Sequence, residues 1–375
     1  MVSDRAYLAN ARIGEGLSAV ETEVSRVLSS FPKTAQRIEP AALLSADLLI
    51  DLYGEEIRAR AYTTNDPVEG ELMLRPDFTV PVVQMFAQSS QQRAEYIYSG
   101  PVWRRQIPGS HRPKEYLQVG YESFGEVDEP QAEARIFATF SKVFLGLPVQ
   151  PITGDVGLLF SAIDALDTTE RRKAALRRHV WRPVRFERLL RRFSTPDSQT
   201  ETRRELLLAV KSGNVEKLFD KLPEPVSLRS ISEIKERVDI LNIEAETPRL
   251  TETECAKINT ISSLKTTVAN AASSLKKIAP ELEKSIENLS DRADAMADEG
   301  LDPAMVPFDA SYGLTTMEYY DGFVFGFRAQ NRPDLPQLAQ GGRYDALTAI
   351  LGATSPAIGG IVRPEALLAL KGGEV

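Results

Sequence analysis

The amino-acid sequence changes character twice along its length, and these changes restrict the folds that the chain can adopt. Short apolar stretches with period-two alternation over residues 59–124 predict strands, and strand-like patterns return at 310–327 and 358–362. Between them, residues 167–300 are strongly charged and rich in helix-forming side chains. The sequence therefore predicts a β-rich core that is split by an all-helical insertion of roughly 130 residues.

Apolar residues at helical spacing flank the predicted strands. They predict helices over residues 11–31, 41–53, 78–91, 131–145, 155–166 and 364–371. The fold class that follows is α+β, an antiparallel sheet flanked by helices and carrying an all-helical insertion. We expect the core to comprise residues 1–166 and 305–375, with the insertion at 167–304.

Composition excludes several kinds of protein. A net charge of -8 over 375 residues argues against nucleic acid as the main partner, because tRNA or duplex binding usually needs a basic face. The single cysteine, Cys255, excludes an intrachain disulfide, and two histidines make a metal centre unexpected. No apolar run approaches ~20 residues, and the N-terminus lacks the apolar core of a signal peptide. We expect a cytoplasmic protein without metal or cofactor.

One local cluster of basic residues stands out at 170–193. It is consistent with contact to RNA or phosphate. It is also consistent with a solvated helical face that pairs with acidic residues, for example at 280–299 or on a partner subunit. The second interpretation is favoured, because the cluster is short and the whole chain is acidic.

The predicted strand at 116–124 carries polar residues on one face. Period-two alternation places Gln118, Gly120 and Glu122 together. An amide, a bare backbone and a carboxylate make poor core material. This face suits a ligand that lies flat on Gly120 and is held by Gln118 and Glu122.

The preceding strand, expected at 97–106, would run antiparallel to it and present Arg104. A guanidinium there can clamp a ligand carboxylate through two parallel hydrogen bonds. The loop between the strands contains His111, which we interpret as an exposed loop histidine.

Two glycine-containing segments near the C-terminus add weaker signals. A strand expected at 318–327 places Tyr319 and the phenylalanines on one face, packed into the core. It places Tyr320, Gly322 and Gly326 on the other, leaving room for a ligand or for a closely packed helix. Gly341 and Gly342 predict a turn before a helix.

These segments resemble histidyl-tRNA synthetases, a class II aminoacyl-tRNA synthetase family. The stretch IEPAALLSADLL (38–49), which contains Pro40, resembles the dimer-forming first motif, and RPDFT (75–79) resembles the family's RPEGT. Residues 102–122 are similar to the second motif, 312–325 occupy the place of the family's RGLDYY, and 356–368 that of the third motif.

Carried over one position at a time, the resemblance implies a site for free histidine. Asp77 and Thr79 would hold the ammonium group, and Arg104 the carboxylate. The full implied site comprises Asp77, Thr79, Arg104, Gln118, Glu122, Tyr320 and Tyr344, with the two tyrosines at the imidazole. Asp77 is one methylene shorter than the family's glutamate.

Three departures from the family concern the chemistry of ATP. The arginine of RGLDYY becomes Thr315, the third-motif arginine becomes Ala366, and an acidic residue of the second motif becomes Gln106. Each fixed group that meets charge on a reacting phosphate contributes on the order of 3 kcal/mol. The resemblance therefore implies a histidine site without adenylation, and we expect no anticodon-binding domain after Val375.

This combination is similar to a non-catalytic branch, the regulatory subunits of ATP phosphoribosyltransferase. That resemblance implies a hetero-oligomer with a short-form catalytic subunit, which needs the regulatory chain for activity and for feedback inhibition by L-histidine. It also implies self-dimerisation through the 40–53 region. Two alternatives remain open: a truncated class II synthetase that forms an acyl-adenylate, and an RNA-binding pseudo-synthetase that uses the 170–193 cluster.

Overall fold

The computed structural model divides the chain into two compact units. The sheet unit comprises residues 1–158 and 261–375, and the helical unit comprises residues 159–260. The residues whose structure is described are 15–53, 55–107, 109–110, 112–195, 201–213, 230–315 and 319–372. The interpretation of His111 falls outside these residues.

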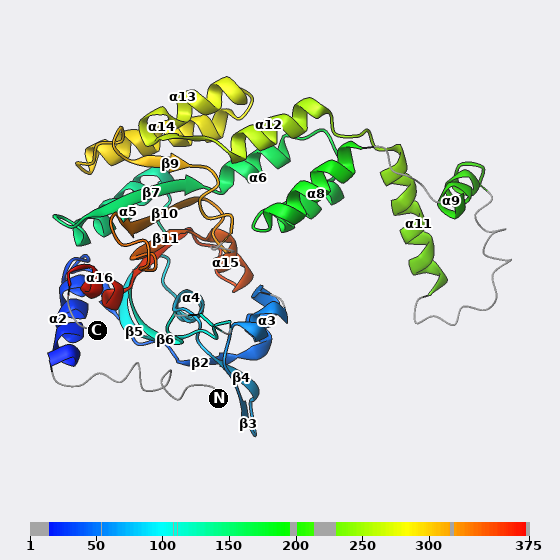
Figure 1. The fold of residues 1–375 in the computed structure, drawn as a ribbon. Coiled ribbons are helices and arrows are strands. Elements are labelled where there is room, and N and C mark those ends of the chain that lie inside the picture. The colour runs from blue at the N-terminus through cyan, green and yellow to red at the C-terminus, as the bar shows by residue number, and fades with distance from the viewer. Residues whose placement is uncertain are drawn as a thin grey trace. The chain divides into compact units, whose positions relative to one another are not determined.

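The sheet unit is built on a large mixed sheet that is mostly antiparallel (Figure 1). Among the described residues its strands are, in spatial order, β1 (Gln36–Arg37), β5 (Ala94–Trp103), β6 (Glu115–Phe124), β12 (Ala357–Val362), β11 (Ala339–Arg343), β10 (Phe323–Ala329), β7 (Val149–Asp155), β9 (Pro307–Asp309) and β8 (Lys265–Thr267). Only the pairs β1–β5 and β7–β9 are parallel among the described strands. The predicted α+β class, with a mostly antiparallel sheet flanked by helices, is confirmed.

One face of this sheet is covered by α5 (Glu129–Val143). The ring of Phe137 packs against those of Phe323, Phe325 and Phe327, with centroids 5.5–6.3 Å apart. These phenylalanines alternate along β10, so the predicted apolar face of this strand is confirmed. The strand begins at Phe323, however, and Tyr320 precedes it.

Two further helices lie beside α5 on the same side of the sheet unit (Figure 1). They are α13 (Val268–Ile278) and α14 (Glu283–Asp298). Both fall in the sequence range that was expected to form the insertion, yet they group with the sheet. At another edge of the unit, α2 (Glu15–Ser29) packs against α16 (Pro364–Leu370), and Lys371 Nζ bonds Glu23 at 2.7 Å.

A small three-stranded sheet completes the N-terminal part of the sheet unit. Its order is β2 (Leu43–Ser45), β4 (Gly70–Leu74) and β3 (Thr63–Asp66). The helix predicted over 41–53 is therefore wrong in its first part, because Leu43 to Ser45 pair with β4, and α3 begins only at Ala46. Pairing with a neighbouring strand outweighs the helical spacing of the leucines.

The sheet unit also contains three shorter helical elements. They are η1 (Glu55–Ala59), α4 (Thr79–Gln88) and α15 (Asp345–Ile350). The turn predicted at Gly341 and Gly342 is wrong, because both glycines lie inside β11 and pair with Gly360 and Gly359 of β12. A methyl group at Gly341 would overlap the backbone oxygen of Gly359, which explains glycine within this strand.

The helical unit consists of helices throughout its described residues. They are α7 (Glu170–Arg178), α8 (Pro183–Ser194), α9 (Glu201–Lys211) and α11 (Ile231–Glu246), with α6 (Gly157–Asp164) and α12 (Glu252–Ser262) at its two sequence ends. Its buried apolar residues include Leu176, Phe186 and Leu190. None of the described helices of the chain has the length and apolar character needed to cross a membrane.

Candidate functional site

Glu122 lies at the centre of the candidate site, on the face of β6 opposite α5. Its side chain is 1% exposed, and its two carboxylate oxygens accept hydrogen bonds from the hydroxyls of Tyr98 at 2.8 Å and Tyr344 at 2.6 Å. Burial raises the pKa of Glu122 to about 7, while the two phenol donors oppose this shift. Within the described residues no cation pairs with it.

Asp77 is a second buried carboxylate, in the turn before α4. Its Oδ2 lies 3.5 Å from the Tyr53 hydroxyl and 3.9 Å from Nη2 of Arg104. Its Oδ1 is buried and has no hydrogen-bond partner in the described part of the chain. Burial raises the pKa of Asp77, and the Arg104 guanidinium opposes that rise. An unpartnered buried acceptor costs about 1–3 kcal/mol, so this oxygen is suited to a ligand donor.

Arg104 and Thr79 flank this carboxylate. The predicted strand at 97–106 ends at Trp103, so Arg104 follows β5 rather than lying within it. Its Nε donates to the Pro76 oxygen at 2.7 Å, which holds the guanidinium beside Asp77 while the side chain stays 35% exposed. Thr79, the first residue of α4, has its hydroxyl 3.2 Å from that of Tyr319.

Gln118 lies on the same face of β6 as Glu122, four residues away. It is 1% exposed, and its Oε1 has no hydrogen-bond partner among the residues that the structure describes. A buried amide oxygen without a donor is unusual in native proteins. Gln118 and Asp77 thus each present an unsatisfied acceptor.

Aromatic side chains close over this face. The ring centroid of Tyr320 lies 4.6 Å from that of Tyr319 and 6.1 Å from that of Tyr344. Burial raises the pKa of the Tyr320 and Tyr344 hydroxyls well above the usual value, so both remain protonated donors. The structure therefore brings the seven predicted residues to one face of the sheet and the turns above it.

The glycines on this face serve protein side chains. A methyl group at Gly120 would overlap the ring of Tyr98, and one at Gly359 would overlap the Glu122 carboxylate. The prediction that a ligand lies flat on Gly120 is therefore wrong in this structure. Likewise, a methyl group at Gly326 would meet Tyr312 and Gln337, so the room above this glycine is also filled.

Sequence reasoning missed three residues of the site: Tyr53, Tyr98 and Tyr319. Tyr98 pairs with Gly120 across the β5–β6 ladder, and a tyrosine opposite a glycine was the available signal. No comparable local pattern marks Tyr53, which reaches Asp77 from α3. Tyr319 was assigned to the apolar core with the phenylalanines of β10, but it lies with the other tyrosines.

The positions that depart from the synthetase motifs also have defined places. Thr315 is exposed, and Gln106 donates to the backbone oxygen of Pro113 at 3.2 Å. Ala366 is buried in α16, and a guanidinium is present three residues earlier at Arg363. Its Nη2 lies 3.4 Å from Oε1 of Gln340 on the site's face, so a cation remains close to the position of the third-motif arginine.

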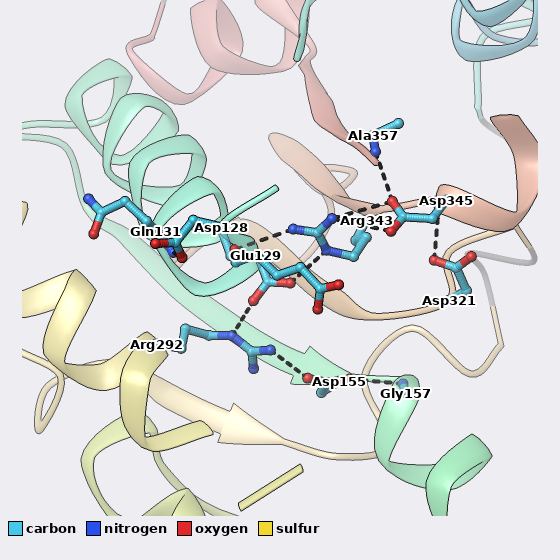
Figure 2. A network of polar contacts seen from close by, with 11 residues as sticks. Asp128, Glu129, Gln131, Asp155, Gly157, Arg292, Asp321, Arg343, Asp345 and Ala357 are labelled. Atoms are coloured by element: carbon cyan, nitrogen blue, oxygen red, sulfur yellow. Dashed lines mark hydrogen bonds and ion pairs between the residues drawn. The ribbon is translucent and has the colours of Figure 1, made fainter. Parts of the chain in front are cut away.

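A second cluster of buried charges lies on the opposite face of the same sheet (Figure 2). Glu133 of α5 is 2% exposed and accepts from Nε of Arg343 at 2.8 Å and from Nε of Arg292 at 2.5 Å. Arg292, on α14, also donates to Asp155 of β7 at 2.7 Å. This ion-pair cluster joins the helical layer to two strands.

The ion-pair cluster extends to the residues on either side of Tyr344. Arg343 Nη1 lies 3.3 Å from both carboxylate oxygens of Asp345, and Asp345 accepts from the backbone N–H of Ala357 at 2.8 Å. Asp321 accepts from the first N–H groups of α15, and burial raises its pKa to about 6. These contacts fix the backbone on both sides of Tyr344 (Figure 2).

The candidate site contains groups that suit the binding of a charged ligand. It offers two buried carboxylates, an amide, an arginine and several phenol donors. No group of three or more His, Cys, Asp and Glu side chains that could hold a metal ion occurs among the described residues. The carboxylates, the guanidinium and the hydrogen-bonding groups of the site favour a small zwitterionic ligand that carries N–H donors at both ends.

A family model described as histidyl-tRNA synthetase matches residues 19–251 and 215–367 of the chain. Two similar proteins are each named ATP phosphoribosyltransferase regulatory subunit. The one from Chelativorans sp. (strain BNC1) is 28% identical over 88% of this chain and 92% of its own length. The one from Mesorhizobium japonicum is 28% identical over 91% of this chain and 94% of its own.

Solved structures show the same fold at lower identity. An ATP phosphoribosyltransferase regulatory subunit/histidyl-tRNA synthetase from Bacillus halodurans superposes with a TM-score of 0.67 at 18% identity, over 96% of this chain and 81% of that chain. A histidine–tRNA ligase subunit from Alicyclobacillus acidocaldarius gives a TM-score of 0.60 at 19% identity, covering 97% and 95%.

Proposed function

This chain belongs to the histidyl-tRNA synthetase family, and from that premise we propose that it is the non-catalytic regulatory subunit of an ATP phosphoribosyltransferase. Its partner is a short-form catalytic subunit, which needs this chain for activity. L-histidine is the effector and acts through this chain. The protein works in the cytoplasm as part of histidine biosynthesis.

The observation that carries the proposal is the unsatisfied state of the candidate site. Two acceptors in residues at least nine-tenths buried, Oδ1 of Asp77 and Oε1 of Gln118, await donors. A free amino acid brings an ammonium group with three donors, and histidine adds an imidazole N–H. An amino-acid ligand therefore meets groups that the protein alone leaves unpaired.

Each end of histidine finds a complementary group. Asp77 takes the ammonium, and the Arg104 guanidinium, held 3.9 Å from Asp77, takes the carboxylate. The imidazole lies toward Glu122, whose carboxylate already accepts two phenol hydrogen bonds and retains further lone pairs. Tyr320 and Tyr344 stack around the ring.

Feedback inhibition requires that histidine binds one state of the complex more tightly than another. Such coupling amounts to about 1–3 kcal/mol in known systems. In this chain the site and the helical layer share one stretch of backbone, since Tyr344 contacts Glu122 and the adjacent Arg343 contacts Glu133 of α5. A ligand that shifts Tyr344 acts on the packing of α5 through that connection.

We also propose that the chain dimerises through residues 40–53, which comprise β2 and the whole of α3. Leu43 on this element is 45% exposed, and Leu48, Ile50 and Leu52 are only partly buried against the local core. A second copy would cover these side chains.

The test is reconstitution with a short-form ATP phosphoribosyltransferase catalytic subunit. The rate of ATP-dependent phosphoribosyl transfer is measured for the catalytic subunit alone, with this chain, and with this chain plus L-histidine. We expect activation by the chain and inhibition by histidine. With an Asp77→Asn chain we expect activation to persist while inhibition weakens. A rate that this chain leaves unchanged in both conditions contradicts the proposal.

A residual synthetase activity is the alternative that Arg363 and Arg104 favour, because they keep two cations near the site. ATP–pyrophosphate exchange in the presence of histidine distinguishes the two functions. We expect no exchange, since Thr315 stands where the family has an arginine that meets the developing phosphate charge.

A further inference from the structure

A concave site of about 260 Å³ lies within the helical unit, between α7, α8, α9 and α11. Among the described residues, its charged lining consists of five arginines and one carboxylate: Arg171, Arg172, Arg192, Arg203, Arg249 and Glu244. The whole chain carries a net charge of -8, so this is a local reversal of sign. We refer to it as the arginine site.

The one carboxylate of the arginine site is already committed. Arg172 is 6% exposed and donates from Nε to Glu244 Oε2 at 2.8 Å, from Nη2 to the Glu244 backbone oxygen at 3.0 Å, and from Nη1 to the Pro248 oxygen at 2.8 Å. These bonds join α7 to α11 and shape the floor of the site. Glu244 is therefore engaged by Arg172 rather than by the exposed arginines of the lining.

Three arginines at the rim remain without a counter-charge. Arg171, Arg192 and Arg249 are exposed and form no ion pair with any residue that the structure describes. Other basic residues of the same unit do have carboxylate partners, such as Arg177 with Asp164 and Arg191 with Glu187. Holding unpaired like charges around one hollow is unfavourable, and a bound anion would relieve the repulsion.

We propose that the arginine site binds a small anion that carries two or more phosphate groups. Guanidinium groups bind phosphate oxygens in pairs of parallel hydrogen bonds, and several arginines around one hollow suit a ligand with clustered negative charge. The volume suits a pyrophosphate group with at most a small organic part. The site is separate in sequence from the proposed histidine-binding residues, so it would give the chain a second effector.

Nucleic acid fits these observations less well. A polynucleotide needs an extended basic surface that follows its backbone, whereas these arginines surround one small hollow. The acidic charge of the whole chain also repels a long polyanion.

The experiment uses the purified full chain and inorganic pyrophosphate, titrated by calorimetry at fixed moderate salt. The test variant is Arg171→Gln/Arg192→Gln, which removes two unpaired rim charges. The matched control is Arg185→Gln/Arg188→Gln, since these arginines are exposed on α8 and lie outside the lining of the site. We expect about tenfold weaker binding in the test variant and an unchanged affinity in the control.

Two further measurements keep the result interpretable. Circular dichroism establishes that the helical unit still folds, and the single variant Arg249→Gln, outside any helix, should weaken binding in the same direction. Equal losses in test and control variants, or no binding to the original chain, overturn the proposal. So does a short RNA hairpin that binds the chain and is not displaced by pyrophosphate.

The nature of the anion is read from parallel titrations. Pyrophosphate, a sugar bisphosphate and inorganic monophosphate are compared on the original chain. Tighter binding of the ligands with two phosphate groups supports the proposal, and equal affinity for monophosphate contradicts it.

Discussion

Glu133 and Glu122 are both almost fully buried, lie on opposite faces of one sheet, and have opposite surroundings. Glu133 accepts from two guanidinium groups, those of Arg292 and Arg343. Glu122 accepts from the phenols of Tyr98 and Tyr344 and has no cation paired with it among the described residues, and burial raises its pKa to about 7. Glu133 is neutralised by cations of the protein, whereas Glu122 can take up a proton or accept a hydrogen bond from a ligand.

The difference separates a structural cluster from a binding site. Around Glu133 most donors and acceptors are matched, although Nη1 of Arg292 has no acceptor among the described residues and its guanidinium lies over the Phe323 ring at 4.8 Å. Around Glu122 the unmatched groups are acceptors, on Asp77 and Gln118. Surplus buried acceptors that lack a hydrogen-bond donor among the described residues indicate a cationic or N–H-bearing ligand.

The largest expected effect comes from breaking the ion-pair cluster. Arg292→Met leaves Glu133 with one cation and Asp155 with none, and removal of one partner from a buried pair costs about 3–5 kcal/mol. Urea unfolding checks this, followed by the fluorescence of Trp103 in a Trp181→Phe background so that the signal reports on the sheet unit.

The control for that measurement is Arg332→Met. Arg332 pairs with Asp334 at 2.7 Å, but both side chains are exposed, so the loss should be below about 1 kcal/mol. Equal losses for the two variants would show that the buried cluster adds no more than a surface pair.

The next expected effect is a gain in the free energy of unfolding rather than a loss. Glu122→Gln should stabilise the sheet unit above pH 7 by about 3 kcal/mol, because the folded protein no longer holds a buried charge that has a pKa near 7 there and 4.5 in the unfolded chain. The folded state binds the proton more tightly, so stability falls as pH rises from 4.5 to 7 and then stays level.

The difference between Glu122→Gln and the original chain should therefore vanish near pH 4 and grow to its full value by pH 7. Urea unfolding at a series of pH values provides the measurement. A stability difference that is independent of pH would mean that Glu122 is ionised equally in both states.

A smaller effect concerns the ligand. Asp77→Asn removes the charge proposed to hold the ammonium and should weaken histidine binding by about 2 kcal/mol, or roughly 30-fold. The matched control is Asp334→Asn, an exposed aspartate away from the site, which should bind as the original chain does. Calorimetry with L-histidine compares the three proteins, and equal affinities would remove Asp77 from the site.

The smallest expected effect comes from removing one of the two phenol hydroxyls that donate to Glu122. Tyr98→Phe removes one hydrogen bond to Glu122, worth about 1–2 kcal/mol when the carboxylate is ionised, and should raise the pKa of Glu122 further. Urea unfolding should show this loss at pH 8 and less of it at pH 5. A loss that is larger at pH 5 would contradict the assigned hydrogen bond.

The sequence predicted those parts of the site that depend on local pattern. Alternation along one strand placed Gln118 and Glu122 together, and the resemblance supplied Asp77 and Tyr344. Tyr98 and Tyr53 were missed because their contacts depend on neighbours from other elements.

The fold shows the same limit. The turn predicted at Gly341 and the helix predicted at Leu43 fail because strand pairing with distant segments decides both. The contact of Arg292 with Glu133 joins residues 159 positions apart, and no spacing in the sequence predicts it. Local periodicity thus indicates element type, while long-range pairing decides where an element ends and what it packs against.

The most direct test of this account is calorimetric titration of the full chain with L-histidine, without ATP, at pH 8. We predict saturable binding of one histidine per chain, which the Asp77→Asn change weakens roughly 30-fold and which does not depend on nucleotide. Absence of heat at millimolar histidine, or binding that appears only when ATP is added, would contradict it.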